Sequence, residues 1–185
     1  LPRKFGVHPV DDVQVIAPMY RTPIGVDALN TALQQALNGS DSVMSRRVGK
    51  QLFRAGDKVI QLKNNYEKEV FNGDIGRVRG IDPHSEVLEV VIDGRIIEYD
   101  FQEAEQLTLA YCISTHRSQG GEYPIVVLPL MTQHYKMLQR NLLYTAITRA
   151  RQCVVLVGTR KAIGIAVTNN RVAERFTGLK RRLRR

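Results

Sequence analysis

Three uninterrupted apolar runs in the second half of the chain constrain its fold more than any other feature. They cover residues 107–114, 125–130 and 153–159, and a helical pattern over about 136–151 separates the last two. Continuously apolar runs are typical of strands buried on both faces, and alternation with helices indicates a parallel sheet. We therefore expect an α/β unit with helices on both sides of its sheet.

The N-terminal region adds a strand and a helix to this unit. Residues 12–19 form another apolar run that ends at a turn, and a helix is expected from about 26 to 37. One face of that helix is apolar and comprises Val26, Leu29, Leu33 and Leu37. The polar stretch at 38–50 is interpreted as a linker or loop.

The middle of the chain has a different pattern, which predicts a second unit. Short β-like segments occur at 58–62, 76–81, 87–92 and 95–101. Asp93-Gly94 between the last two favours a hairpin, because type I′ turns need positive φ at both central positions. Four or five short strands in about fifty residues suggest a small barrel. The predicted organisation is an α/β unit over 1–52 and 107–185, interrupted by a barrel at 53–106.

The formal net charge of +9 is distributed unevenly. From Arg171 onward there are seven basic residues against one acidic residue, Glu174, so the tail at 171–185 carries +6 and the remainder +3. Such a run either binds phosphate backbones without sequence preference or is the solvated end of a helix. The sequence leaves both interpretations open.

Several classes of site and location are not expected. The apolar runs are too short to span a membrane, and the cysteines and histidines lack the spacing of a metal site. Cys112 and Cys153 fall within expected buried strands, which is consistent with free thiols in a reducing cytoplasm. The 185 residues also contain no G-x-x-x-x-G-K-[ST] run to hold nucleotide phosphates and magnesium.

Two polar motifs flank the apolar runs. Thr115-His116-Arg117-Ser118-Gln119-Gly120-Gly121-Glu122 follows the run at 107–114, and Tyr144-Thr145-Ala146-Ile147-Thr148-Arg149-Ala150-Arg151 precedes the run at 153–159. On the expected helix, Arg149 falls at the edge of the apolar face, whereas Arg140 and Arg151 point to water. Periodicity alone leaves Arg149 either reaching across a cleft or covering the core with its aliphatic stem.

Together these motifs resemble the fifth and sixth motifs of superfamily 1 helicases, specifically the RecD/TraA-type branch (exodeoxyribonuclease V alpha-subunit-like). Ala17-Pro18-Met19-Tyr20-Arg21 resembles the fourth motif. Lys63-Asn64-Asn65-Tyr66 and the following stretch at 70–76 resemble the SH3-like barrel inserted into the second motor lobe of that branch. The resemblance covers about residues 12–160. It implies a RecA-like lobe of the P-loop-NTPase type, interrupted by an SH3-like β-barrel.

The resemblance implies roles at a nucleotide site. Arg149 corresponds to the arginine finger, and Arg21 to a second arginine directed at the γ-phosphate of ATP. Glu122, beside Gly121, corresponds to the residue that meets the ribose, and Tyr20 to one that stacks on adenine. The cofactor would be ATP with Mg²⁺, bound mainly by a preceding N-terminal RecA-like lobe.

The resemblance also implies contacts to single-stranded DNA. Thr115 and His116 correspond to residues that contact the DNA backbone, although a histidine at a strand end is often only structural. Asn65 and Tyr66 would meet the strand on the barrel, where stacking on an aromatic side chain contributes about 1–3 kcal/mol per base. Tyr66 could instead belong to the barrel core.

The function implied is that of the C-terminal motor lobe of an ATP-dependent 5′–3′ DNA helicase in repair, recombination or conjugation. Its partners would be single-stranded DNA, the N-terminal lobe of the same polypeptide and, in some relatives, subunits of a nuclease complex. Without a Walker A run, this chain alone is not expected to hydrolyse ATP. Two alternatives stay open: a non-catalytic nucleic-acid-binding module, and the helicase part of a conjugative relaxase.

Overall fold

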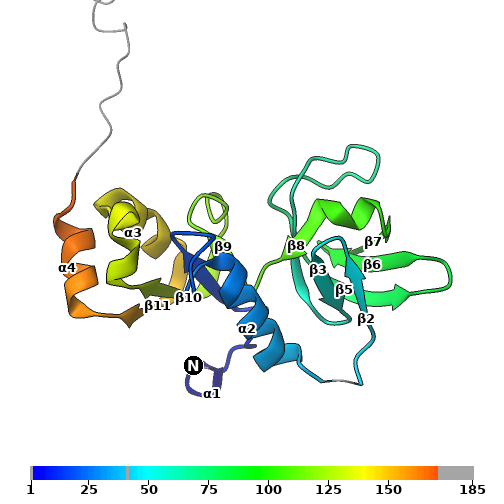
Figure 1. The fold of residues 1–185 in the computed structure, drawn as a ribbon, viewed down its shortest axis with the longest axis horizontal. Helices are drawn as coiled ribbons and strands as arrows, with labels where there is room; N and C mark the ends of the chain where they lie inside the picture. The colour runs from blue at the N-terminus through cyan, green and yellow to red at the C-terminus, as the bar shows by residue number, and fades with distance from the viewer. Residues whose placement is uncertain (1, 41, 171–185) are drawn as a thin grey trace, which may run out of the picture.

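Two units lie side by side in the computed structural model, which describes residues 2–40 and 42–170 (Figure 1). The basic tail at 171–185 lies outside the described residues. The N-terminal residues form a short helix, α1 (Pro2–Phe5). Among the described residues, no helix has the length and hydrophobicity that a membrane crossing requires.

The first unit is built on a parallel sheet of four strands in the order β11-β10-β1-β9. These strands are β1 (Val13–Ala17), β9 (Cys112–Ser114), β10 (Tyr123–Leu130) and β11 (Ala150–Gly158). Ile16 faces a cluster shared with α3 (Arg140–Ile147) and α4 (Arg160–Thr168), whereas Ala17 faces α2 (Val26–Asn38). Successive side chains of a strand point to opposite faces, so helices cover both faces of the sheet, as predicted.

The second unit is an antiparallel five-stranded sheet in the order β7-β6-β5-β4-β8, with a β2–β3 hairpin beside it. Its strands are β2 (Ser45–Val48), β3 (Gln51–Arg54), β4 (Lys58–Gln61), β5 (Ile75–Asp82), β6 (Val87–Ile92), β7 (Arg95–Asp100) and β8 (Leu107–Leu109). A 3₁₀ helix, η1 (Glu103–Gln106), leads into β8. The hairpin predicted at Asp93-Gly94 is present, with φ of 48° and 76° at the two positions.

The apolar run at 107–114 was expected to be one strand, and this expectation is wrong. β8 pairs antiparallel with β4 of the second unit, while β9 pairs in parallel with β1 of the first. The chain changes sheets at Ala110-Tyr111, both of which are buried. Because no glycine, proline or charged residue interrupts the run, the run itself contains no signal of the change.

The long helix expected over 136–151 is also wrong. A 3₁₀ helix, η2 (Thr132–Met137), precedes α3, and α3 ends at Ile147. Ala150 already pairs with Tyr123 of β10, so pairing at the sheet edge overrides the helical pattern. Arg149 consequently lies in the turn between α3 and β11, and Arg151 lies on the strand.

The helix expected at 26–37 is confirmed as α2, but its buried face differs from the prediction. Leu37 is 42% exposed, whereas Asn30 and Gln34 are buried. The Asn30 amide donates to the Cys112 carbonyl and accepts from the Cys112 N–H, both at 2.8 Å. The helix thereby supplies hydrogen-bond partners to the backbone of β9, the edge strand of the parallel sheet. The stretch at 38–50, interpreted as a loop, contains β2.

Candidate nucleotide and DNA-contact site

Arg149 brings the two motifs together. Its Nη1 donates to the Gly121 carbonyl at 3.2 Å, its Nε to the Thr145 carbonyl at 3.3 Å and its Nη2 to the Thr148 hydroxyl at 3.4 Å. These distances are longer than the usual value of about 2.9–3.0 Å for N–H···O bonds. Arg149 is half-buried beside the glycine loop. Its guanidinium is therefore held there only by weak contacts.

Glu122 lies at the same place. Its Oε2 accepts from Nε of Arg151 at 2.9 Å, and the two side chains are 56% and 66% exposed. An exposed ion pair of this kind contributes only about 0–1 kcal/mol. We name Gly121, Glu122, Arg149 and Arg151 the arginine corner. It lies where β10 and β11 begin.

Tyr123 underlies the arginine corner and was not singled out from the sequence. Its N–H donates to the Arg149 carbonyl at 2.8 Å, and its hydroxyl lies 2.6 Å from where a Cβ on Gly121 would stand. The ring therefore occupies the space that a side chain at 121 would need. Burial raises the pKa of Tyr123, and the nearby charge of Arg149 opposes this shift.

The loop from Thr115 to Glu122 spans the sheet from the end of β9 to the start of β10. Thr115 is buried, and Ser118 donates to its carbonyl at 2.8 Å. His116 is exposed. Of the two residues that the motif assigns to DNA, the structure therefore presents His116 at the surface, while the Thr115 side chain faces the interior.

Tyr20 and Arg21 do not join the arginine corner. They follow the carboxyl end of the parallel strand β1, whereas the corner precedes β10 and β11, so the two sites leave opposite ends of the sheet. The Tyr20 hydroxyl donates to Oγ of Ser114 at 2.9 Å, and the Arg117 guanidinium lies 5.8 Å from the Tyr20 ring centroid. Arg21 is exposed. The roles of both at a nucleotide stay predictions.

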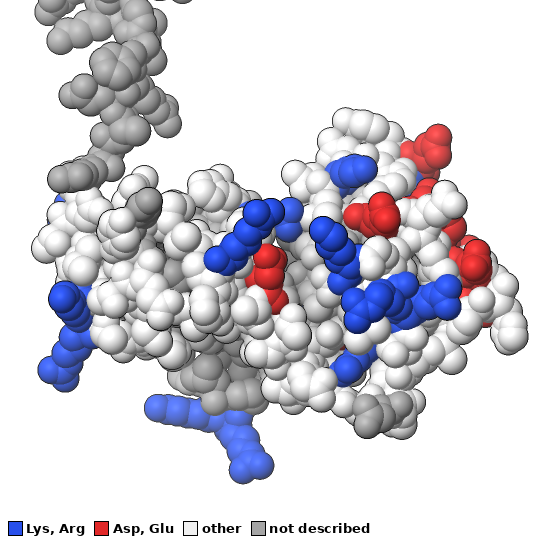
Figure 2. Space-filling view, in the orientation of Figure 1, with Lys and Arg blue, Asp and Glu red and all other residues white. Residues whose placement is uncertain are grey.

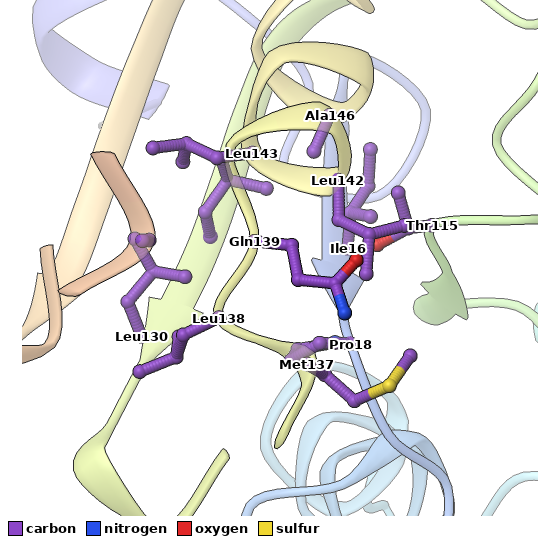
Figure 3. Close-up of a pocket in the computed structure, with 12 residues that line it drawn as sticks. Ile16, Pro18, Thr115, Leu130, Met137, Leu138, Gln139, Leu142, Leu143 and Ala146 are labelled. Atoms are coloured by element: carbon purple, nitrogen blue, oxygen red, sulfur yellow. The ribbon is translucent and has the colours of Figure 1, made fainter. Parts of the chain in front are cut away.

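A small apolar cavity lies behind the loop (Figure 3). It is enclosed by Ile16 and Pro18 of the β1 region, by Thr115, and by residues of η2 and α3. Its volume of about 20 Å³ has room for about one water molecule. It is therefore a packing gap beside Thr115 at the start of the 115–122 loop, and it is too small to hold a nucleotide.

The barrel presents an aromatic pair at its surface. Tyr66 is 75% exposed and Phe71 is 47% exposed, and their rings meet edge to face with centroids 6.1 Å apart. Asn64 donates to the Tyr66 hydroxyl at 3.2 Å. Assignment of Tyr66 to the barrel core is therefore wrong. Phe71 lay within the stretch at 70–76 but was not singled out.

Asn65 has a different place from Tyr66. Its backbone pairs with Val70, and its side-chain oxygen accepts from the Lys68 N–H at 3.2 Å. Asn65 is half-buried and shapes the loop that carries the aromatic pair. Its assigned contact with DNA stays a prediction.

The two units are joined through a buried carboxylate that the sequence pattern did not reveal. Asp57 is fully buried and accepts four hydrogen bonds, of 2.6–2.9 Å, from the side chains of Gln34, Asn38 and Tyr111 and from the Arg54 N–H. We name these five residues the joint cluster. Burial raises the pKa of Tyr111, and the charge of Asp57 raises it further, so Tyr111 remains a donor. A lone Asp in a loop carries no sequence signal of such a role.

Basic side chains gather on the face shown in Figure 2, in a band from the border between the units onto the barrel. The exposed basic residues of the β2–β3 hairpin are Arg46, Arg47 and Lys50. Such a surface favours phosphate backbones. Within the described residues, no group of three His, Cys, Asp or Glu side chains is placed to hold a metal ion.

Two family models match the chain. The ATP-dependent RecD-like DNA helicase SH3 domain matches residues 29–92, and the UvrD-like helicase C-terminal domain matches residues 109–157. The first match runs from α2 through most of the barrel. The second contains the loop at 115–122 and all of α3.

Curated relatives match nearly the whole chain. The ATP-dependent RecD2 DNA helicase of Deinococcus radiodurans is 40% identical over 172 residues, which is 93% of this chain and 23% of the relative. The RecBCD enzyme subunit RecD of Mycolicibacterium smegmatis is 28% identical over 184 residues, 95% of this chain and 30% of the relative. The chain thus spans less than a third of these relatives.

Solved helicase structures share the fold. The Pif1 helicase from Bacteroides in complex with ADP-AlF3 and ssDNA has a TM-score of 0.59 at 18% identity, covering 92% of this chain and 44% of that chain. Bacteroides Pif1 bound to ssDNA has a TM-score of 0.56 at 19% identity, covering 78% and 40%. These likenesses and the SH3 match confirm the predicted fold class.

Proposed function

Because the chain belongs to the RecD-like branch of superfamily 1 DNA helicases, as its C-terminal motor region, we propose that it supplies an arginine finger to ATP held by a preceding lobe. The observation that carries the proposal is the contact between Arg149 and Gly121. It unites residues 28 positions apart in one corner at the edge of the sheet. Both residues belong to the motifs that resemble the family.

The proposed chemistry requires Arg149 to leave its present partners. A cation directed at the transferred phosphoryl group stabilises developing charge and can raise the rate by about 10³–10⁵. The weak contacts of Arg149 cost little to exchange for charge-assisted bonds to phosphate. ATP with Mg²⁺ supplies the phosphoanhydride bond that is broken, and the preceding lobe would hold it. Arg21 is proposed as a second cation that approaches the nucleotide on closure of the lobes.

Glu122 is proposed to bind the ribose. Its carboxylate is exposed and, among the described residues, pairs only with Arg151, so a ribose hydroxyl can replace the arginine as hydrogen-bond donor. Gly121, whose side-chain space the Tyr123 ring occupies, would meet the nucleotide through its backbone. A Tyr20 contact with adenine would need the nucleotide to extend toward the other end of the sheet.

Single-stranded DNA is proposed to contact both units. His116 and the Thr115 loop would meet the backbone, and Tyr66 with Phe71 would stack on bases. Ala substitution of Tyr66 is then expected to weaken strand binding, while Tyr66→Phe, which keeps the ring, retains it. Movement would run 5′ to 3′ in the cytoplasm, either as a stand-alone helicase or within a nuclease complex. We also propose the domain boundaries expected from the sequence, with the barrel at 53–106 and the motor lobe at 1–52 and 107–185.

The experiment is to measure DNA-stimulated ATPase activity of the longer polypeptide that contains this chain and its nucleotide-binding lobe. Arg149→Ala is expected to lower turnover by about a hundredfold or more, with near-normal nucleotide binding. Arg140→Ala is the matched control, because Arg140 is exposed and its Nε donates to the Val167 carbonyl.

Unchanged turnover in Arg149→Ala would remove the arginine-finger role. If strand binding by the same variant is also indifferent to nucleotide, a non-catalytic nucleic-acid-binding module becomes the better description. The chain alone is expected to show no ATP hydrolysis. Hydrolysis by the purified 185-residue chain, lost in Arg149→Ala, would contradict the assignment of catalysis to two lobes.

A further inference from the structure

A buried lysine of the barrel reaches into the first unit. Lys58, the first residue of β4, is 4% exposed, and its Nζ donates to the Val10 carbonyl at 2.9 Å. The same Nζ lies 5.8 Å from the ring centroid of Tyr123, within the range of a cation–π contact. Buried lysines are rare unless a specific partner holds them. Here Tyr123 belongs to the first unit, and Val10 lies in the segment before β1, with its side chain packed in the barrel core.

Tyr123 connects this lysine to the arginine corner. The Tyr123 backbone N–H donates to the Arg149 carbonyl, and the Tyr123 hydroxyl lies against Gly121. Gly121 in turn accepts the Arg149 guanidinium. Lys58, Tyr123, Gly121 and Arg149 are therefore a continuous series of contacts from the barrel to the corner.

A second contact supports the same connection from the surface. Arg77 of β5 pairs with Asp11 at 3.1 Å, and the Asp12 carbonyl accepts from the Ile125 N–H at 3.0 Å. The segment that carries Val10, Asp11 and Asp12 is thus held by the barrel on one side and by β10 on the other. A displacement of the barrel would move this segment together with Tyr123.

We propose that Lys58 and Tyr123 are positioning residues through which the barrel sets the place of Gly121 and Arg149, so that strand binding on the barrel raises nucleotide turnover. The inference rests on the proposed function and adds the route by which DNA controls it. Arg149 has weak contacts of its own, so a small shift of Tyr123 is enough to change its position. Packed interfaces of this kind transmit displacements between discrete arrangements.

The test is the factor by which single-stranded DNA raises the ATPase rate of the longer polypeptide. Lys58→Met removes the charge and keeps most of the side-chain length. It is expected to lower this factor about fivefold or more, the size of a typical coupling. Dissociation constants for nucleotide and for a thymidine oligonucleotide should stay near wild type, because Lys58 touches neither ligand. Lys58→Arg, which keeps a cation, is expected to restore part of the stimulation.

Lys68→Met is the matched control. Lys68 also lies over a tyrosine ring, 5.5 Å from the centroid of Tyr99, but both residues belong to the barrel. None of the contacts of Lys68 with other described residues reaches the arginine corner, so DNA stimulation measured at saturating oligonucleotide should be unchanged. An equal loss in both variants would overturn the proposal, since it would show a general effect of barrel stability.

Two further results decide the inference. If Lys58→Met does not fold, Tyr123→Leu carries the test, with the same loss of stimulation expected and wild-type stimulation overturning the proposal. If Arg149→Ala abolishes turnover while folded Lys58→Met keeps full stimulation, the positioning route is wrong and the arginine finger stands. If Arg149→Ala has no effect, the proposed function itself fails.

Discussion

The joint cluster and the arginine corner both depend on charged groups, but they differ in burial and bond length. Asp57 of the joint cluster is fully buried and accepts four hydrogen bonds no longer than 2.9 Å. The Arg149 guanidinium of the corner is half-buried, and its contacts are 3.2–3.4 Å long. The only ion pair of the corner that the structure describes is largely exposed.

This difference indicates that one region holds the units together and the other can exchange its contacts. Removing a partner from a buried, fully satisfied polar group is costly, because the remaining groups lose their hydrogen bonds and water cannot replace all of them. Exposed or long contacts exchange readily with water or ligand. The joint cluster therefore keeps the barrel in place on α2, whereas the arginine corner is free to rearrange, as its proposed role at a nucleotide requires.

The largest effect on stability is expected from breaking the joint cluster. Asp57→Ala leaves the donors of Gln34, Asn38, Arg54 and Tyr111 without their acceptor, and should lower the free energy of unfolding by about 3 kcal/mol or more. Thr148→Ala removes a 3.4 Å contact of the corner and should change it by less than about 0.5 kcal/mol. Denaturant unfolding of the 185-residue chain measures both. Equal losses would abolish the distinction between the two regions.

A smaller effect is expected from the pH dependence of Lys58, which lies between the two regions. Burial lowers the pKa of Lys58 to about 8, the charges of Asp11 and Asp12 raise it, and that of Arg77 lowers it. The unfolded chain thus binds more protons than the folded chain between pH 8 and the ordinary lysine pKa of about 10.5. Stability contributed by this position should therefore rise with pH through that window.

Comparison with Lys58→Met isolates this contribution. From pH 7.5 to 9.5, the wild type should gain on the order of 1–2 kcal/mol in unfolding free energy relative to Lys58→Met. The measured range ends at about pH 9.5 because unfolded tyrosines begin to ionise near pH 10. Parallel curves for the two proteins would show that the lysine is not desolvated, and the contact with Tyr123 would then lose its basis.

A small effect on folding is also expected from Glu122→Gln in the arginine corner. It breaks the pair with Arg151 and should cost less than about 1 kcal/mol of stability. Nucleotide affinity of the longer polypeptide should nevertheless fall about tenfold, because a charged hydrogen bond to the ribose is replaced by a neutral one. Titration with a fluorescent nucleotide measures this, and Glu89→Gln on the barrel is a suitable control.

Much of the fold was predictable because local patterns carried it. The strands at 87–92 and 95–100 and the hairpin between them follow from short β-like segments on either side of Asp93-Gly94, and α2 follows from its apolar period. The end of α3 and the break at Ala110-Tyr111 were not predictable. In both places the chain is recruited by a neighbouring strand, β10 or β4, that is distant in sequence.

The site was predictable in part. The two motifs directed attention to Arg149, Gly121 and Glu122, and the structure brings these three together. It separates Tyr20 and Arg21 from them and buries Thr115. Asp57 and Tyr123 had no distinguishing pattern, since one is a single acid in a loop and the other an aromatic residue at a strand start.

The sequence by itself determined that a parallel α/β lobe carries a β-barrel, since this depends on periodicity and on contiguous motifs. Only the tertiary structure decided that Arg149 lies beside the glycine-rich loop and how firmly each polar group is held. Burial and hydrogen-bond length depend on residues far apart in the chain, such as Lys58 with Tyr123 and Gln34 with Asp57. Those long-range contacts make one region rigid and leave the other able to respond to a ligand.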